Sequence, residues 1–215
     1  MINNNYKYPY PNFKAHKIAH AKSSINGVTA NFEIYRLQKR DRAFLRKLLE
    51  TISIRTLMPN ISSQAAETWQ NILQNGIFNA MSPLNRSFLA ISENKPCGII
   101  TYRKGQTTNL IDLCSIPIET NKKALLCGKT MILHFLQDIQ KSHSKNIKLE
   151  AVKSSHGNPA ALYESLGFET IDIGNRYIEM ACSRDNINKQ ATKLKKNIQI
   201  TKCKPEKTDL NNIVS

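Results

Sequence analysis

Several short stretches of the chain have the apolar and β-branched composition of β-strands, some with alternating polar positions. The expected strands cover residues 28–37, 87–92, 97–102, 108–118, 147–152, 168–173 and 176–182. The second and third are separated by Glu93, Asn94, Lys95 and Pro96, which predicts an antiparallel hairpin. Pro117 lacks the N–H that a regular ladder needs, so we expect a bulge or a splayed strand there.

Other stretches repeat their apolar residues at the spacing of an α-helix. We expect helices after Asp41, from Ser62 or Ser63 to Gly76, over 128–143 and over 160–166, with a basic loop over 119–127. The short helix over 160–166 follows an Asn158-Pro159 start and ends at a glycine. The alternation of strands and helices predicts an α/β fold (α+β, with a mixed and mostly antiparallel sheet) flanked by helices.

The chain has 215 residues and a net charge of +15, which fits one domain with basic extensions. Residues 1–27 and 183–215 are rich in Asn, Lys and Ser and show little apolar periodicity. We therefore expect a domain over 28–182, a basic N-terminal arm and a flexible basic C-terminal tail. The charge predicts attraction to nucleic acid or another acidic partner through these ends.

The composition excludes several classes of protein. No apolar run approaches the length of a membrane-spanning helix, so no membrane partner is expected. The 5 cysteines show no Cys-x-x-Cys or Cys/His ligand spacing, which predicts reduced thiols in a cytoplasmic protein. His16 and His20 have helical metal-ligand spacing, but no third ligand completes a site, and we assign no metal.

Two segments together carry a likeness to a known family. Residues 110–132 (LIDLCSIPIETNKKALLCGKTMI) form a strand, a loop and a helix, and residues 158–168 (NPAALYESLGF) form the short helix and the start of a strand. Both resemble the corresponding parts of the GNAT (N-acetyltransferase) superfamily, and the element order over about 28–182 is similar as well. The resemblance implies a GNAT-like fold and acetyl-CoA as cofactor.

In that family a loop with the pattern (Arg/Gln)-x-x-Gly-x-(Gly/Ala) offers backbone N–H groups and a helix N-terminus to the pyrophosphate of acetyl-CoA. With Gly128 as its last glycine, Lys123 takes the basic position and Leu126 replaces the middle glycine. The cofactor-binding residues that the resemblance implies are Ile116, Ile118, Lys123, Ala124, Leu126, Cys127, Gly128, Lys129, Thr130 and Asn158.

Three residues are candidates for catalysis. Tyr163 takes the place of the tyrosine that, in the family, protonates the departing thiolate. Asp112, on the strand before the loop, is one candidate general base, and its place in the alternation predicts that it shares a face with Leu110 and Cys114. Glu150 on the next strand is the other candidate.

The resemblance implies an acetyl-CoA-dependent N-acetyltransferase in which a primary amine of a protein, peptide or small molecule attacks directly in a ternary complex. Two alternatives stay open. One is a catalytically inactive basic protein of the same fold that binds nucleic acid or a protein partner, and the other is a regulatory or structural module that docks partners through its ends.

Overall fold

Within the described residues, a single nine-stranded sheet forms the centre of the protein. The computed structural model describes residues 14–38, 41, 45–46, 62–115, 121–153 and 159–209. The strands are β1 (Lys14–Ile25), β2 (Val28–Leu37), β3 (Arg86–Ser92), β4 (Lys95–Arg103), β5 (Thr107–Ser115), β6 (Asn146–Val152), β7 (Glu169–Ile173), β8 (Tyr177–Ser183) and β9 (Ile198–Asp209). The helices that lie wholly within the described residues are α3 (Ser63–Ala80), α4 (Asn121–Gln140), α5 (Pro159–Ser165) and α6 (Arg184–Lys195).

The strands lie in the order β7-β8-β6-β5-β4-β3-β2-β1-β9. All neighbours are antiparallel except β5 and β6, which are parallel. The expected mixed and mostly antiparallel sheet with flanking helices is therefore confirmed.

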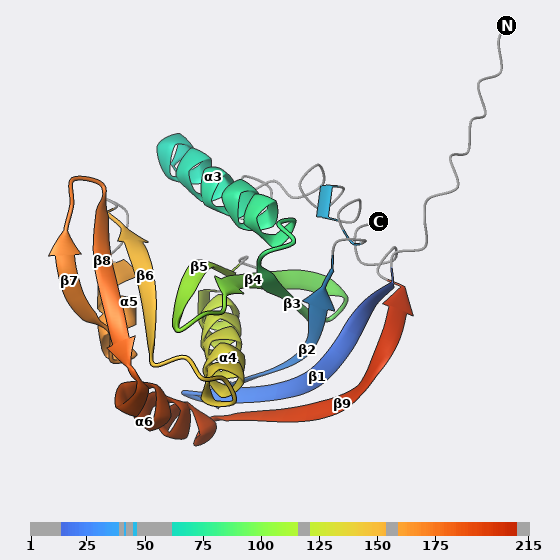
Figure 1. The fold of residues 1–215 in the computed structure, drawn as a ribbon. Helices are drawn as coiled ribbons and strands as arrows, with labels where there is room; N and C mark the ends of the chain where they lie inside the picture. The colour runs from blue at the N-terminus through green and yellow to red at the C-terminus, as the bar shows by residue number, and fades with distance from the viewer. Residues whose placement is uncertain are drawn as a thin grey trace, which may run out of the picture.

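Helices cover both faces of the sheet (Figure 1). On one face, α4 places Met131, Phe135 and Ile139 in a continuous apolar core with residues of most of the strands. On the other face, α3 contacts β3, β4 and β5, and its Leu73 and Ile77 are fully buried. The two faces of β5 therefore lie in different surroundings, one in the core beneath α4 and the other against α3.

The predicted hairpin is present. β3 and β4 pair antiparallel, and Glu93 and Asn94 connect them with φ angles of 51° and 60°. Two successive residues in this left-handed region are what a tight two-residue hairpin turn requires. The helix expected to stop at Gly76 continues to Ala80, because burial of Ile77 outweighs the roughly 1 kcal/mol cost of a helical glycine. Of the helix expected after Asp41, only residues 41, 45 and 46 lie in the described part.

The expectation of a flexible C-terminal tail is wrong for residues 184–209. Arg184–Lys195 forms helix α6, whose Ile187 and Ala191 are fully buried, and β9 pairs with β1 along most of its length. Lys14–Ile25, expected to be part of the N-terminal arm, forms β1 between β2 and β9. The sheet therefore extends well beyond the 28–182 boundaries, because Ala15, Ala19 and Ala21 supply a buried face with small side chains.

His134 on α4 is a buried histidine in this core. Its side chain is 7% exposed, its ring packs edge-on against Phe88, and its Nε2 has no hydrogen-bond partner among the described residues. Burial lowers the pKa of His134 to about 4, although Asp138 opposes the shift, and Lys202 and Lys141 add to it. The folded protein therefore holds this imidazole neutral.

This burial predicts a loss of stability in acid. Between pH 6.5 and about 4 the unfolded chain protonates His134 while the folded chain does not, so about 3 kcal/mol of unfolding free energy is lost as the pH falls. His134→Leu should remove that part of the pH dependence in urea unfolding measured from pH 7.5 to 4. His143, which is exposed, offers the matched control His143→Leu. A slope equal in the wild type and His134→Leu would contradict a buried neutral imidazole.

Candidate active site

The parallel strands β5 and β6 separate part of the way along their length. They pair only over Thr107–Asn109 with Asn146–Lys148, at their N-terminal ends. Beyond that point β5 pairs only with β4, up to Ser115, and β6 pairs only with β8, up to Val152. The C-terminal halves of two neighbouring strands are thus left without hydrogen bonds to each other, and Figure 1 shows β6 separating from β5. The splay predicted near Pro117 therefore begins earlier, after Asn109.

A β-bulge at the start of this splay turns Asp112 to a particular side. Leu110 pairs with Tyr102 and Asp112 pairs with Thr101, which leaves Ile111 as an extra residue in β5. Leu110 and Tyr102 belong to the core beneath α4. Asp112 instead accepts a hydrogen bond from a residue of α3, so it lies on the opposite face from Leu110. The prediction that these two residues share a face is wrong, because it assumed unbroken alternation.

The Asp112 carboxyl is half-buried between β5 and α3. Asn79 Nδ2 donates a hydrogen bond to Asp112 Oδ2 at 2.5 Å. Burial raises the pKa of Asp112, and the hydrogen bond from Asn79 acts in the opposite direction. A carboxylate with a raised pKa is a better proton acceptor than an exposed one, which is the property a general base needs.

Helix α5 brings Tyr163 to the same region. The helix starts at Pro159, as predicted, and its end is closed by the backbone N–H of Phe168, which donates to the Tyr163 carbonyl at 3.0 Å. Gly167 has a φ of 81° in this turn, which favours glycine there. The Tyr163 ring packs edge-on against the buried Phe168, with ring centroids 5.7 Å apart.

The environment of Tyr163 keeps its phenol protonated at neutral pH. Burial and, secondly, the negative charge of Asp112 raise the pKa of Tyr163 to about 12. The structure thus brings two of the three predicted catalytic residues close enough to interact electrostatically, although they are 51 positions apart along the chain. A neutral phenol can donate a hydrogen bond to a developing negative charge.

Glu150 is more exposed than these two residues. It lies on β6 opposite Glu179 of β8, which in turn lies opposite Asp172 of β7. Lys148 forms an ion pair with Glu179 at 2.8 Å. Because Leu149 and its neighbours in the alternation face the α4 core, these three carboxylates project from the other face, which is also the face of Asp112. They form a carboxylate row beside the splay.

The predicted loop before Gly128 is helical instead. Helix α4 begins at Asn121, so the backbone N–H groups of residues 126–130 lie beyond its first turn and bond within the helix. Leu126, Cys127 and Thr130 are buried, and Thr130 Oγ1 bonds to Leu126 O at 2.7 Å and to Ser23 Oγ. Their side chains pack in the core. The backbone N–H groups from Leu126 to Thr130, Gly128 and Lys129 included, bond within the helix, contrary to the prediction that this stretch offers free N–H groups.

The free N–H groups of α4 are those of Asn121, Lys122 and Lys123 in its first turn, whereas the N–H of Ala124 is the first to bond along the helix. Lys122 is exposed, Ala124 is partly exposed, and Lys123 Nζ lies 3.4 Å from Glu93 Oε1 in the β3–β4 turn. Of the other predicted cofactor contacts, Ile116, Ile118 and Asn158 lie outside the described residues, as does the side chain of Cys114.

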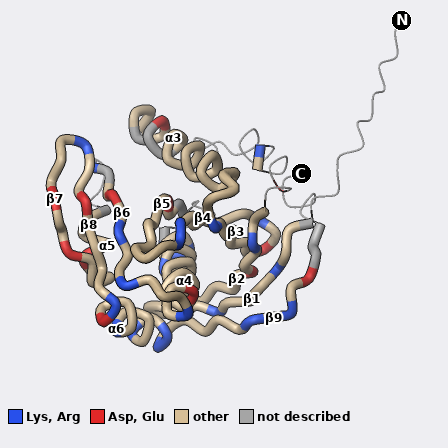
Figure 2. The backbone as a smooth tube through the Cα atoms, viewed as in Figure 1, with Lys and Arg blue, Asp and Glu red and all other residues tan. Residues whose placement is uncertain are grey.

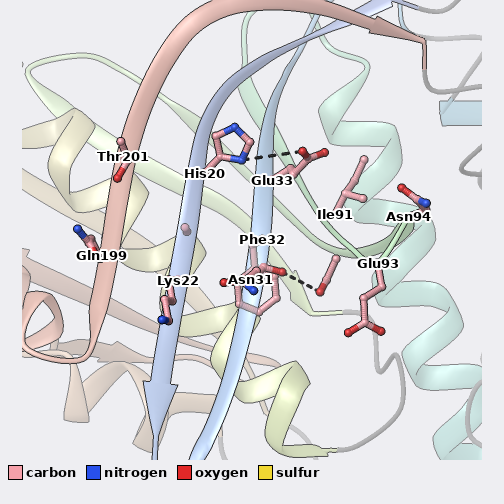
Figure 3. Close-up of a pocket in the computed structure, with 12 residues that line it drawn as sticks. His20, Lys22, Asn31, Phe32, Glu33, Ile91, Glu93, Asn94, Gln199 and Thr201 are labelled. Atoms are coloured by element: carbon pink, nitrogen blue, oxygen red, sulfur yellow. Dashed lines mark hydrogen bonds and ion pairs between the residues drawn. The ribbon is translucent and has the colours of Figure 1, made fainter.

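A pocket of about 480 Å³ that the sequence did not suggest lies elsewhere on the sheet, over β1, β2, β9 and the β3–β4 turn (Figure 3). Glu33 is its most connected residue: Tyr35 donates a hydrogen bond to it at 2.5 Å, and Lys17 lies at 3.3 Å. Burial alone would raise the pKa of Glu33, but these two partners and His20 lower it. None of Asp112, Glu150 and Tyr163 lines this pocket. The alternation of side chains in β1 and β2 could have predicted that His20 and Glu33 share a face. It could not have predicted that a pocket forms there.

Two classes of feature are absent from the part of the chain that the structure describes. No group of three His, Cys, Asp or Glu residues is arranged to hold a metal ion there. No helix in that part is long and apolar enough to cross a membrane.

Comparison with known proteins identifies the fold. No protein-family model and no curated protein matches the sequence. Among solved structures, the chain is similar to the PaiA N-acetyltransferase of Thermoplasma acidophilum in complex with coenzyme A, with 22% identity, a TM-score of 0.50 and coverage of 71% of this chain and 98% of that one. It is also similar to an aminoglycoside 6′-acetyltransferase type Ii (17% identity, TM-score 0.51, coverage 70% and 96%). A third match is an uncharacterized protein of Bacillus halodurans (12% identity, TM-score 0.52, coverage 84% and 98%).

These likenesses confirm the fold expected from the two sequence segments. The chain has the GNAT fold, at sequence identities of 22% and 17% to the two acetyltransferases compared above.

Proposed function

We propose that the protein is an acetyl-CoA-dependent N-acetyltransferase that transfers an acetyl group to a primary amine. The observation that carries the proposal is the opening between β5 and β6, with Asp112 and Tyr163 electrostatically coupled beside it. The fold is shared with acetyltransferases, one of which was crystallised with coenzyme A. The acceptor class comprises proteins, peptides and small molecules that carry a primary amine.

The residues at the start of α4 fit the phosphates of acetyl-CoA. The first turn, including Lys122 and Lys123, offers N–H groups that make no helical hydrogen bond, at the positive end of the helix. Lys122 adds an exposed positive charge beside them. Leu126 does not obstruct this site, because its side chain points into the core. The bound acetyl-CoA would supply the thioester that is attacked.

Asp112 is proposed as the general base. Its half-buried carboxylate accepts a proton from the acceptor's ammonium group, directly or through a water molecule, which leaves a neutral amine able to attack a carbonyl carbon. The hydrogen bond from Asn79 holds Oδ2, and Oδ1, which has no hydrogen-bond partner among the described residues, is the oxygen proposed to accept that proton. Glu150 is the second candidate; it is exposed and lies in the carboxylate row on the same face.

Tyr163 is proposed to act on the departing sulfur. A thiol has a pKa of about 8.5, so a thiolate is a weaker base than a phenolate whose parent phenol has a pKa of about 12. Hydrogen-bond donation from Tyr163 to the developing thiolate is therefore favoured over complete transfer of its proton. This stabilises the negative charge where it forms.

The carboxylate row supports a cationic acceptor. Carboxylates directly opposite one another on neighbouring strands repel each other, and only Glu179 of the three has an ion-pair partner among the described residues. A substrate with positive charge beyond the reacting amine would relieve this repulsion. The face that carries Asp112 therefore favours amines with additional basic groups over isolated neutral ones.

The proposal predicts that acetyl-CoA stabilises the protein. At a ligand concentration of 100 times Kd, binding adds about 2.7 kcal/mol, which corresponds to a rise in Tm of roughly 5–10 °C for a domain of this size. Protein shown by mass spectrometry to be free of CoA would be measured by differential scanning fluorimetry with acetyl-CoA up to 2 mM.

Lys122→Glu should reduce this rise, because it reverses a charge at the first turn of α4, whereas Lys145→Glu, which reverses an exposed charge before β6, should not. Release of free CoA would then be followed with a panel of primary amines that includes basic peptides and polyamines. An unchanged Tm at 2 mM acetyl-CoA would contradict the proposal and favour a catalytically inactive protein of this fold.

A further inference from the structure

A second pocket, of about 620 Å³, lies where α6 leads into β9. It is lined by Lys22 and Ser24 of β1, Gln137 of α4, and the segment from Lys195 to Ile200. We call it the basic pocket. β9 is the outermost strand of the described sheet, so the pocket lies at a sheet edge that no further described strand covers.

The lining of the basic pocket is suited to an anion. Lys22, Lys195 and Lys196 are exposed, and none of the three forms an ion pair within the described residues. The remaining polar groups are side-chain amides and one hydroxyl, and no Asp or Glu lines the pocket. Three lysines on one concave surface that no Asp or Glu lines give it a positive potential, which favours an anion.

The positive charge continues outward from the pocket along α6. Lys189 and Lys193 follow each other at i, i+4, and Lys196 comes three positions later, which puts the three on one side of the helix. Ile187 and Ala191 form the opposite, buried side. Figure 2 shows Lys and Arg positions along α6 and, beyond the uncharged first residues of β9, again farther along that strand. A surface longer than one pocket fits a polymer of regularly spaced negative charges rather than a single small anion.

The basic pocket is separate from the proposed acetyl-transfer site. Gln137 and the first turn of α4 lie on the same helix, and Gln137 is 16 residues from Asn121. At 1.5 Å per residue this separates the two ends by about 24 Å. An anion in the basic pocket therefore does not occupy the position proposed for the phosphates of acetyl-CoA.

We propose that the basic pocket and the lysine side of α6 bind single-stranded nucleic acid through its phosphates. No aromatic residue lines the pocket, so the bases have no stacking partner there and the affinity should come from contacts to the phosphates, which are the same for every sequence. The lysines are displayed from a folded helix and strand rather than from a flexible tail, so the contacts have a defined position. This inference does not depend on the proposed transferase activity.

The proposal is tested with a fluorescein-labelled 12-nucleotide oligouridylate, whose binding to the full chain is followed by anisotropy from 50 to 200 mM KCl. Each phosphate neutralised on a single strand contributes about −0.7 to the slope of log Kobs against log[salt]. Lys195→Ala combined with Lys196→Ala should therefore weaken binding at 50 mM KCl and make the slope shallower by about 1.4.

A matched control removes the same charge elsewhere. Lys95 and Lys153 are exposed, form no ion pair among the described residues and do not line the basic pocket. Lys95→Ala combined with Lys153→Ala should leave the slope within about 0.3 of the wild type if those lysines contact no phosphate. Lys22→Ala tests the third lysine from a different strand and should reduce the slope by about 0.7. Thermal unfolding of each variant verifies that the fold is intact.

Three outcomes would overturn the proposal. One is an equal loss of affinity in the control pair, which would mean that only net charge matters. Another is equal binding of a 12-residue poly-glutamate peptide, which would mean that the pocket does not favour phosphates. The third is binding to vesicles of anionic phospholipid but not to the oligonucleotide, which would assign the surface to a membrane instead.

Discussion

A chain truncated after Ser183 is expected to be unfolded at 25 °C, although the segment removed has the composition of a polar tail. The truncation removes α6 and β9, and with them the partner of β1 along one whole side. Two buried isoleucines are lost, Ile187 and Ile198, each contributing about 1.5–3 kcal/mol. Added to the lost β1–β9 ladder, this approaches the total stability of 5–15 kcal/mol typical of a domain.

The truncation also removes a polar cap. Arg184 Nη1 donates to the carbonyl of Ile139 at 2.8 Å, and its Nη2 donates to that of Gln140 at 2.6 Å. These are carbonyls of the last turn of α4, which have no partner within the helix. Without Arg184 the Gln140 carbonyl loses this hydrogen bond and the end of α4 loses a favourable positive charge, while the Ile139 carbonyl keeps the hydrogen bonds donated by Ser142 N and Oγ.

Circular dichroism and urea unfolding of the truncated chain provide the measurement, and a point variant makes it quantitative. Ile187→Ala should lower the free energy of unfolding by 2–5 kcal/mol, as expected for a large buried side chain. Lys189→Ala, two positions away on the exposed side of the same helix, should change it by less than about 0.5 kcal/mol. A truncated chain that unfolds cooperatively with the wild-type midpoint would show that α6 and β9 contribute nothing.

The two ends of the chain show why this part of the fold was not predictable from its pattern. β9 is an edge strand, and many of its side chains, such as Thr201 and Lys204, are exposed. Its sequence is therefore largely polar and does not show the apolar pattern that predicts a strand. Lysines and a proline on an edge strand are also what keeps it from pairing with other chains. β1 buries mainly alanines, whose small apolar signal is hidden among lysines, histidines and serines. β1 and β9 are about 180 residues apart along the chain, and the sequence of either segment alone does not indicate that the two pair.

The central strands were predictable because their apolar runs are long. β3 and β4 are buried on both faces, and continuous apolar runs such as Phe88–Ile91 predict strands of this kind. The face of β5 on which Asp112 lies was harder to predict from the sequence. Leu110, Ile111, Asp112 and Leu113 give no sign of a bulge, and the extra residue changes which face each side chain takes.

The start of α4 illustrates the same difficulty. Apolar residues from Ala124 to Cys127 could belong either to a loop or to a helix, and the glycine at 128 favoured a start there. The structure begins the helix at Asn121, because Leu126 and Cys127 can then join the core. Tertiary burial outweighs the local preference for a break before a glycine.

Replacing Asp112 by asparagine is expected to lower the turnover of acetyl transfer by about 10²–10⁴-fold, the range typical of a lost general base. Asparagine keeps the size of the side chain and removes its ability to accept a proton. Glu150→Gln is the matched variant on the neighbouring strand, and its turnover should change by less than about threefold. Both would be measured by release of free CoA with an amine that supports turnover. The reverse ranking would transfer the role of base to Glu150.

The pH dependence of kcat/KM gives an independent test of the same assignment. The rate should fall in acid as Asp112 is protonated, and because burial raises its pKa, the fall should occur at a higher pH than for an exposed aspartate. The hydrogen bond from Asn79 opposes that rise, so Asn79→Ala should move the acid limb to still higher pH while leaving the rate at the alkaline plateau nearly unchanged. A loss of rate at every pH with no movement of the limb would mean that Asn79 only supports packing, and that another group titrates.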